Sequence, residues 1–226
     1  MIDKRCASVE AALEGISDGA TIMVGGFGAV GQPNRLIEAL IDQGARDLTI
    51  IANNAGTGHV GLAKLMEAGR VRRIVCSFPR SSGSVVFEAL FKAGRIELEI
   101  VPQGTLAERI RAAGAGVGAF YTPTAFGTRL AEGKETREIG GRNYVLEYAL
   151  PADAALVEAW RADRWGNCVY RESGRNFNAV MATAASLTIV QTQHMAELGD
   201  LDPEAIATPG IFVNRVVHVP YGDPQG

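Results

Sequence analysis

Three short segments gather glycine and side-chain amides, and none of them holds a carboxylate or a nucleophile. They are Gly25–Gly28 (Gly-Gly-Phe-Gly), Asn53–Gly56 (Asn-Asn-Ala-Gly) and Pro102–Gly104 (Pro-Gln-Gly). Glycine lets backbone N–H groups approach a ligand closely, and the Asn and Gln amides add uncharged hydrogen-bond donors. Such a lining can stabilise negative charge on an acyl oxygen, although it supplies neither an attacking group nor a base.

Each of these segments directly follows a predicted strand. The predicted strands are Thr21–Val24, Asp47–Ala52, Val71–Phe78 and Arg95–Val101, and the predicted helices are Asn34–Ile41, Leu62–Ala68, Val85–Ala93 and Leu106–Ala113. Strands that alternate with helices, with a glycine ending each helix, are typical of βαβ units and a parallel sheet. Because ligands bind beyond the carboxyl ends of such strands, we expect the three segments to converge on one site.

The second half of the chain has a different pattern. Two glycines at 140–141 between Glu135–Ile139 and Arg142–Glu147 predict a β-hairpin. Further strands are predicted at Ala154–Trp160, Cys168–Arg171, Leu187–Gln191 and Ile211–Val219, with a helix at Phe177–Ala185. We expect one α/β domain over residues 1–220, an open and mainly parallel sheet with helices on both faces, followed by a frayed tail at 221–226.

Composition excludes several classes of protein. The 226 residues hold 22 Lys and Arg against 25 Asp and Glu, and aromatic residues make up only 7%. This balance argues against a nucleic-acid partner, and the apolar runs are too short to span a bilayer. The three cysteines form no Cys-x-x-Cys pair, which favours reduced thiols in a cytoplasmic protein, and the three histidines have no metal-ligand spacing.

One motif suggests a different ligand. Gly26, Gly28 and Gly31 match the Gly-x-Gly-x-x-Gly fingerprint of dinucleotide-binding folds. However, Pro33 fits the first position of the helix, so Gly31 lies outside that helix, and the next strand ends in Asn53-Asn54 without the acidic residue that binds a ribose. The pattern therefore gives little support for a dinucleotide.

A family resemblance runs through almost the whole chain, from about residue 5 to about residue 219. The segment from Asp18 to Phe27, continuing through Gly31 to Pro33, resembles the signature of the family I coenzyme A transferases, the 3-oxoacid group. Four further segments resemble the same family: Asn53–Gly56, Pro102–Arg109, Phe120–Thr124 and Gly174–Asn178. The order of these motifs indicates the CoA-transferase fold and, by length, an A (alpha) subunit.

The resemblance implies a reaction in which coenzyme A moves from succinyl-CoA to a 3-oxoacid, with the CoA thioester as a substrate and no permanently bound cofactor. Family members use a glutamate in a Ser-Glu-Asn-Gly motif as nucleophile and form a glutamyl-CoA thioester. No glutamate in this chain is followed by asparagine. The resemblance therefore implies that a beta subunit carries the nucleophile in a hetero-oligomer, expected to be α2β2.

The resemblance also assigns roles to residues. It gives the CoA and oxyanion loop as Gly25, Gly26, Phe27, Gly28, Ala29, Val30 and Gly31. Asn53, Asn54 and Gln103 fall in the acyl pocket as supporting catalytic residues.

Two classes of alternative stay open. Within the family the acceptor is 3-oxoadipate, favoured by the run Cys76–Arg80, or else acetoacetate or another short 3-oxoacid. The distal carboxylate of 3-oxoadipate needs a cation, and Arg80, which follows the third strand, is the candidate. Outside the family, a self-contained sugar-phosphate isomerase or ligand-sensing domain would need acid and base groups at the strand ends, where this chain has amides.

Overall fold

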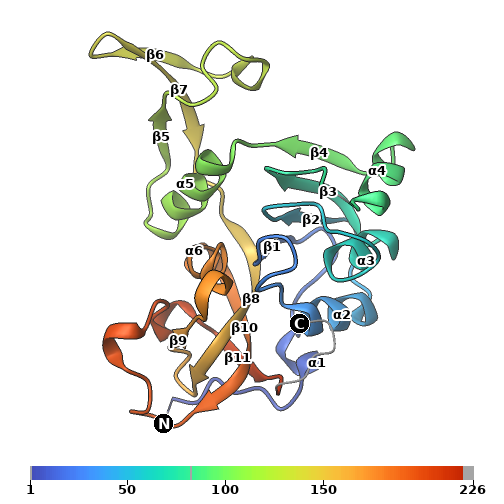
Figure 1. The fold of residues 1–226 in the computed structure, drawn as a ribbon, viewed down its shortest axis with the longest axis vertical. Coiled ribbons are helices and arrows are strands. Elements are labelled where there is room, and N and C mark those ends of the chain that lie inside the picture. The colour runs from blue at the N-terminus through green and yellow to red at the C-terminus, as the bar shows by residue number, and fades with distance from the viewer. Residues whose placement is uncertain (1, 82, 221–226) are drawn as a thin grey trace.

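The computed structural model describes residues 2–81 and 83–220. Its centre is a large sheet in the order β11-β10-β8-β1-β2-β3-β4, with β9 beside β8 (Figure 1). The strands are β1 (Thr21–Val24), β2 (Leu48–Ile51), β3 (Val71–Cys76), β4 (Glu97–Ile100), β8 (Ala152–Asp163), β9 (Cys168–Val169), β10 (Ala185–Ala196) and β11 (Arg215–His218). All pairs are parallel except β8 with β9, which confirms the predicted open and mainly parallel sheet.

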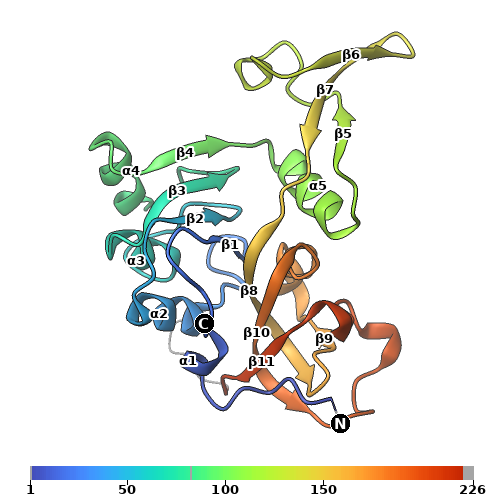
Figure 2. The same ribbon diagram turned by 180° about the vertical axis from the view of Figure 1, so that it is seen from behind.

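Helices cover both faces of this sheet, as Figures 1 and 2 show from opposite sides. The helices are α1 (Val9–Ala12), α2 (Asn34–Gln43), α3 (Leu62–Glu67), α4 (Val85–Lys92), α5 (Gln103–Gly114) and α6 (Asn178–Met181). Ile22 and Val24 of β1 belong to the core with α1 to α4, whereas Met23 between them belongs to the core with α5 and α6. Successive strand residues point to opposite faces, so a strand buried on both sides is continuously apolar.

Proline and glycine mark the ends of the two helices that follow β1 and β4. The helix α2 follows Pro33 and ends at Gly44, whose φ of 97° is a left-handed value that glycine adopts without strain. The helix α5 follows Pro102 and begins at Gln103, three residues before the predicted start at Leu106. Gln103 therefore lies in the first turn of a helix, close to the unpaired N–H groups of that turn.

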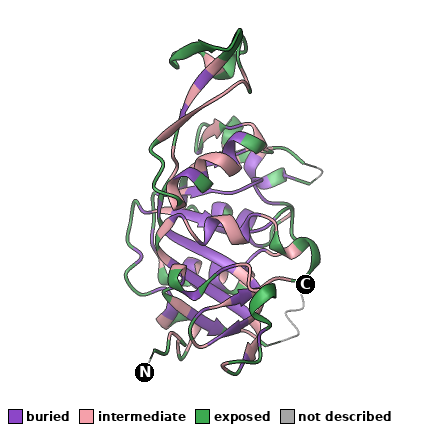
Figure 3. Cartoon of the chain, turned by 90° about the vertical axis from the view of Figure 1, so that its left-hand side faces the viewer, coloured by how far each residue is buried: buried purple, intermediate pink, exposed green. Residues whose placement is uncertain are grey.

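A second, three-stranded antiparallel sheet projects from the body of the molecule (Figure 1). It consists of β5 (Ala119–Thr122), β6 (Thr136–Ile139) and β7 (Arg142–Tyr148), in the order β5-β7-β6. The predicted hairpin is confirmed, since Gly140 and Gly141 have the positive φ values, 58° and 76°, that its two-residue turn needs. Figure 3 shows that this projection is mostly exposed or half-buried, in contrast to the central strands.

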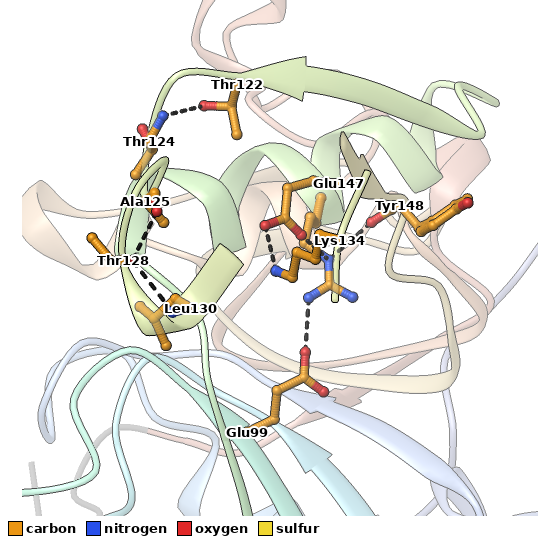
Figure 4. A network of polar contacts seen from close by, with 10 residues as sticks. Glu99, Thr122, Thr124, Ala125, Thr128, Leu130, Lys134, Glu147 and Tyr148 are labelled. Carbon is orange, nitrogen blue, oxygen red and sulfur yellow. Dashed lines mark hydrogen bonds and ion pairs between the residues drawn. The ribbon is translucent and has the colours of Figure 1, made fainter. Parts of the chain in front are cut away.

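Ion pairs anchor the projection to the large sheet (Figure 4). Glu147 of β7 is buried and lies 2.6 Å from Lys134 Nζ and 4.0 Å from Arg109 Nε. Arg109, on α5, also donates to the Glu99 carboxylate of β4 at 2.9 Å. Burial alone raises the pKa of the Glu99 carboxyl, but hydrogen bonds from Arg109 and Arg73 outweigh burial and hold that pKa below its ordinary value.

Several element boundaries differ from those expected. The segment Phe177–Ala185, predicted as one helix, contains only the four-residue α6 before β10 begins at Ala185. The motif around Phe120 contains β5, which was not expected as a strand. The tail at 221–226, predicted to fray, lies outside the described residues. None of the helices within residues 2–81 and 83–220 has the length and apolarity that a membrane crossing requires.

Candidate active site

The loop between β1 and α2 forms a miniature hairpin at the carboxyl edge. Phe27 N–H donates to Val30 O at 3.0 Å, and Val30 N–H donates back to Phe27 O at 3.2 Å. Gly28 and Ala29 form the two-residue tip, where Gly28 has a φ of 63° and open space around it. Both tip residues are exposed, and no acceptor in the described part of the chain takes their N–H groups.

Two asparagines from the 174–178 segment form hydrogen bonds with the backbone of this loop. Asn176 Oδ1 accepts the Gly26 N–H at 3.2 Å, and Asn176 Nδ2 donates to Val30 O at 3.0 Å. Asn178 is fully buried, and its Nδ2 donates to Gly31 O at 2.8 Å. The Gly26 N–H is therefore already engaged, whereas the N–H groups of the exposed tip residues Gly28 and Ala29 are open to a ligand.

The predicted amides after β2 and β4 come together. Gln103 Nε2 donates to Asn53 Oδ1 at 2.6 Å, and Asn53 is only 2% exposed. Asn54 is also buried, but its Oδ1 accepts the Gly56 N–H at 2.9 Å and so shapes its own turn. Gln103 and Asn53 thus form one polar unit at the edge of the sheet, while Asn54 has a structural bond.

Arg80 is not bonded to these groups. Its side chain is 65% exposed, and its Nε lies 3.8 Å from Glu88 Oε1 of α4. Within residues 2–81 and 83–220, the ion pair with Glu88 is the polar contact that the Arg80 guanidinium makes. An exposed arginine balanced by a carboxylate can still meet a ligand that enters from solvent, at the cost of weakening that pair.

A cavity of about 560 Å³ lies beside the loop. It shares Ala29, Val30 and Gly31 with the loop and is otherwise lined mainly by residues of β8, β10 and the 170–174 segment. None of Asn53, Asn54 and Gln103 lines it, so this cavity is distinct from the Gln103–Asn53 pair.

The Glu158 carboxylate is a polar group of this cavity with fixed partners. It accepts hydrogen bonds from Gln191 Nε2 at 3.1 Å and from Gln193 Nε2 at 2.6 Å. Gln191 also accepts the Leu36 N–H in the first turn of α2 at 3.2 Å, which fixes the helix that follows the loop.

Sequence reasoning missed Glu158, Gln191 and Gln193, and it treated Asn176 and Asn178 only as part of a family motif. These residues come from strands and a segment about 150 positions away from the loop. No local spacing in the sequence indicates that these residues lie next to the loop.

Comparison with known proteins gives the family. The Coenzyme A transferase family model matches residues 6–219. This chain belongs to the coenzyme A transferase family. The resemblance inferred from the motifs is thereby confirmed, and so is the enzyme class.

Two curated relatives of this transferase chain are named as A subunits. It is 63% identical over 219 residues to the A subunit of the 3-oxoadipate CoA-transferase of Pseudomonas putida, a match that covers 97% of this chain and 95% of the relative. It is 49% identical over 215 residues to the A subunit of the succinyl-CoA:3-ketoacid coenzyme A transferase of Xanthomonas campestris pv. campestris (strain B100), covering 95% and 88%. The place of this chain in the family is that of the A-type polypeptide.

A solved structure supports the fold. The acyl-CoA transferase YdiF of Escherichia coli O157:H7 superposes with a TM-score of 0.84 at 24% identity, covering 97% of this chain. This chain spans only 48% of the length of that transferase. At this identity the likeness concerns the fold alone.

Proposed function

We propose that this chain is the alpha component of a transferase that moves coenzyme A from succinyl-CoA to 3-oxoadipate. The observation that carries the proposal is the 63% identity, over nearly the full length of both chains, to a polypeptide named for 3-oxoadipate. We also propose a partner beta subunit that carries the nucleophilic glutamate in a Ser-Glu-Asn-Gly motif, because no glutamate in these 226 residues precedes an asparagine.

The proposed chemistry is a balanced exchange of acyl groups. The partner's glutamate carboxylate attacks the succinyl thioester carbon, the C–S bond breaks, and an acyl-glutamyl anhydride and CoA thiolate form. The thiolate then attacks the glutamyl carbonyl, which releases succinate and leaves a glutamyl-CoA thioester. The 3-oxoadipate carboxylate repeats the two steps in reverse order, which yields its CoA thioester and regenerates the glutamate.

In this scheme the chain contributes hydrogen-bond donors rather than an attacking group. Each attack places negative charge on a carbonyl oxygen, and fixed donors aimed at that oxygen lower the barrier. The Gly28 and Ala29 N–H groups, together with the Gln103–Asn53 pair, are the donors we assign. Their neutrality suits a site that accepts carboxylates in every half-reaction, since a cation held there would also stabilise the ground state.

The surface around these groups suits a docked partner. Phe27, Val30, Val60 and Phe78 are each about half exposed, and they come from the loops that follow β1, β2 and β3. Apolar side chains grouped on one edge favour association with another protein surface. A shared site of this kind requires an interface of about 2,000 Å² or more, and we expect an α2β2 assembly.

A second acceptor has support of its own. The Xanthomonas relative, 49% identical, is named for 3-ketoacids in general. Acetoacetate is the simplest such acid, and it lacks the distal carboxylate. The two acceptors are distinguished by the ratio of their kcat/KM values with the assembled enzyme.

The test is reconstitution with a second chain. This chain is purified alone and co-purified with a beta-type family member containing Ser-Glu-Asn-Gly, and each sample is assayed with succinyl-CoA and 3-oxoadipate. We expect activity only from the pair. Borohydride or hydroxylamine trapping after succinyl-CoA should modify a glutamate on the partner. Activity from partner-free protein, or a trapped glutamate within this chain, would overturn the proposal.

A further inference from the structure

Asn176 and Asn178 connect three parts of the molecule that are far apart in the sequence. Asn176 bonds Gly26 and Val30 of the loop, while its Nδ2 also donates to Ser173 O at 2.8 Å. Asn178 Oδ1 accepts the Glu158 N–H of β8 at 3.0 Å. The loop after β1 is therefore held against both the 173–178 segment and the neighbouring strand β8.

The position of Asn178 also explains why two residues of the loop are glycines. A Cβ atom on Gly25 would lie 1.8 Å from Asn178 Oδ1, and a Cβ on Gly31 would lie 2.8 Å from Asn178 Nδ2. At Gly25 a side chain would fit only if Asn178 moved away, and at Gly31 the Gly174 carbonyl oxygen, also 2.8 Å from such a Cβ, would have to move as well. Gly25 and Gly31 thus leave room for the Asn178 side chain, whereas Gly28 has open surroundings at the tip.

The Asn176 carboxamide oxygen accepts hydrogen bonds both from the loop and from the 173–178 segment. Asn176 Oδ1 takes the Gly26 N–H and the Phe177 N–H, the latter at 2.7 Å. With Gly26 held in this way, the reciprocal Phe27–Val30 bonds fix the direction of the tip. The Gly28 and Ala29 N–H groups therefore owe their outward orientation to a side chain about 150 residues further along the chain.

We infer that Asn176 is a positioning residue for the transfer reaction, and that Asn178 is its buried support. This inference rests on the function proposed above, because it assumes that the Gly28 and Ala29 N–H groups face the acyl oxygen. Asn176 itself touches no substrate; it sets the angle from which the loop tip does so. A displacement of about 1 Å at reacting groups costs on the order of 100-fold in rate.

The test compares three variants in the assembled enzyme. Asn176→Ala removes the bonds to both Gly26 and Val30, whereas Asn176→Asp keeps the acceptor for Gly26 and Phe177. Asn167→Ala is the matched control, since Asn167 is half-buried and also bridges two segments, from Gly210 N–H at 2.8 Å to Asp163 Oδ2 at 2.8 Å. Each variant is assayed for kcat and KM with succinyl-CoA, and amide exchange is followed by mass spectrometry over residues 25–31.

Asn176→Ala should lower kcat by about 100-fold with KM changed less than about threefold, because misplaced loop donors stabilise the transition state less while substrate binding is largely kept. Exchange over 25–31 should rise in this variant and stay unchanged in Asn167→Ala. Asn176→Asp should recover at least about tenfold of the lost kcat, since it restores the bond to Gly26. A purely structural asparagine would instead lower melting temperature without this split between kcat and KM.

Any of three results would overturn the inference. The first is a kcat for Asn176→Ala within about threefold of the wild type, and the second is an equal loss of kcat in Asn176→Ala and Asn167→Ala. The third is unchanged exchange over 25–31 in Asn176→Ala. A wild-type assembly without transferase activity but with the expected exchange pattern would instead contradict the proposed function and leave the asparagine contacts established.

Discussion

The side chain of Gln103 is hydrogen-bonded to the side chain of Asn53, with 2.6 Å between Gln103 Nε2 and Asn53 Oδ1. The bond joins the end of β2 to the first turn of α5, across the intervening strand β3. It orients the Gln103 amide and leaves the second N–H of that amide and the Asn53 amide nitrogen for a ligand. A fixed amide stabilises developing charge better than a mobile one, because it needs no reorganisation during the reaction.

Replacing Gln103 should therefore affect turnover more than binding. Gln103→Ala is expected to lower kcat by about 10²–10³-fold, with a small change in KM, because it removes a donor that acts on the transition state. Gln43→Ala is the matched control: its amide donates to Ile16 O at 2.9 Å, at the opposite end of α2 from the loop. Steady-state kinetics of the co-purified assembly give both numbers, and an unchanged kcat for Gln103→Ala in an intact assembly would reject this role.

Arg80 provides a prediction about substrate choice. If its guanidinium leaves Glu88 to pair with the distal carboxylate of 3-oxoadipate, Arg80→Ala should reduce kcat/KM for that acid. A charge-assisted bond contributes about 1.5–3 kcal/mol, which corresponds to roughly 10–150-fold. Acetoacetate, which has no distal carboxylate, should be used as before.

Lys92→Ala is the control for this variant. Lys92 Nζ lies 3.6 Å from Glu88 Oε2, so its removal frees the same carboxylate without removing Arg80. We expect Lys92→Ala to leave the use of both acids unchanged. Equal losses of kcat/KM for 3-oxoadipate and acetoacetate in Arg80→Ala would show that Arg80 does not bind the distal carboxylate.

The anchor of the projecting sheet should be a major contributor to stability. Glu147→Gln removes the charge of a buried carboxylate that pairs with Lys134 and Arg109. Hydrogen bonds to charged groups contribute about 1.5–3 kcal/mol, so the melting temperature should fall by several degrees. Glu97→Gln is the comparison, because the exposed Glu97–Arg72 pair at 3.0 Å is expected to contribute less than about 1 kcal/mol. Thermal unfolding of both variants measures the difference, and equal shifts would contradict it.

The large sheet and the edge at which the site lies could be predicted from the sequence, since both follow from local patterns. Apolar runs that alternate with glycine-ended helices placed β1 to β4, and Gly140-Gly141 placed the β6–β7 turn. The strand β5 was missed because its partner is β7, more than twenty residues further along, and nothing near Phe120 signals that pairing.

The individual roles of the loop glycines could not be predicted for the same reason. Gly25, Gly28 and Gly31 look alike in the sequence, and all three were expected to let the backbone approach a ligand. Only the fold shows that Gly25 and Gly31 make room for Asn178, while Gly28 forms the exposed tip. Gln103 was expected in a loop, but Pro102 is the N-cap of α5, so Gln103 is the first residue of a helix.

The two buried cysteines, Cys76 and Cys168, should be chemically inert in the folded enzyme. Burial raises the pKa of the Cys76 thiol to about 12, and it also raises the pKa of Cys168. The thiolate is the reactive form, so both side chains stay protonated and shielded at pH 8, and their reactivity should not rise between pH 8 and 9 as that of an ordinary thiol does.

Iodoacetamide should modify Cys6 alone, because Cys6 is only partly buried whereas Cys76 and Cys168 are buried. The modification of Cys6 should be slow. Mass spectrometry of native and unfolded protein checks this, and Cys6→Ser should leave the native chain unlabelled and fully active. Labelling of native Cys76 together with loss of activity would mean that its thiol reaches the site, and that a nucleophile is present in this chain.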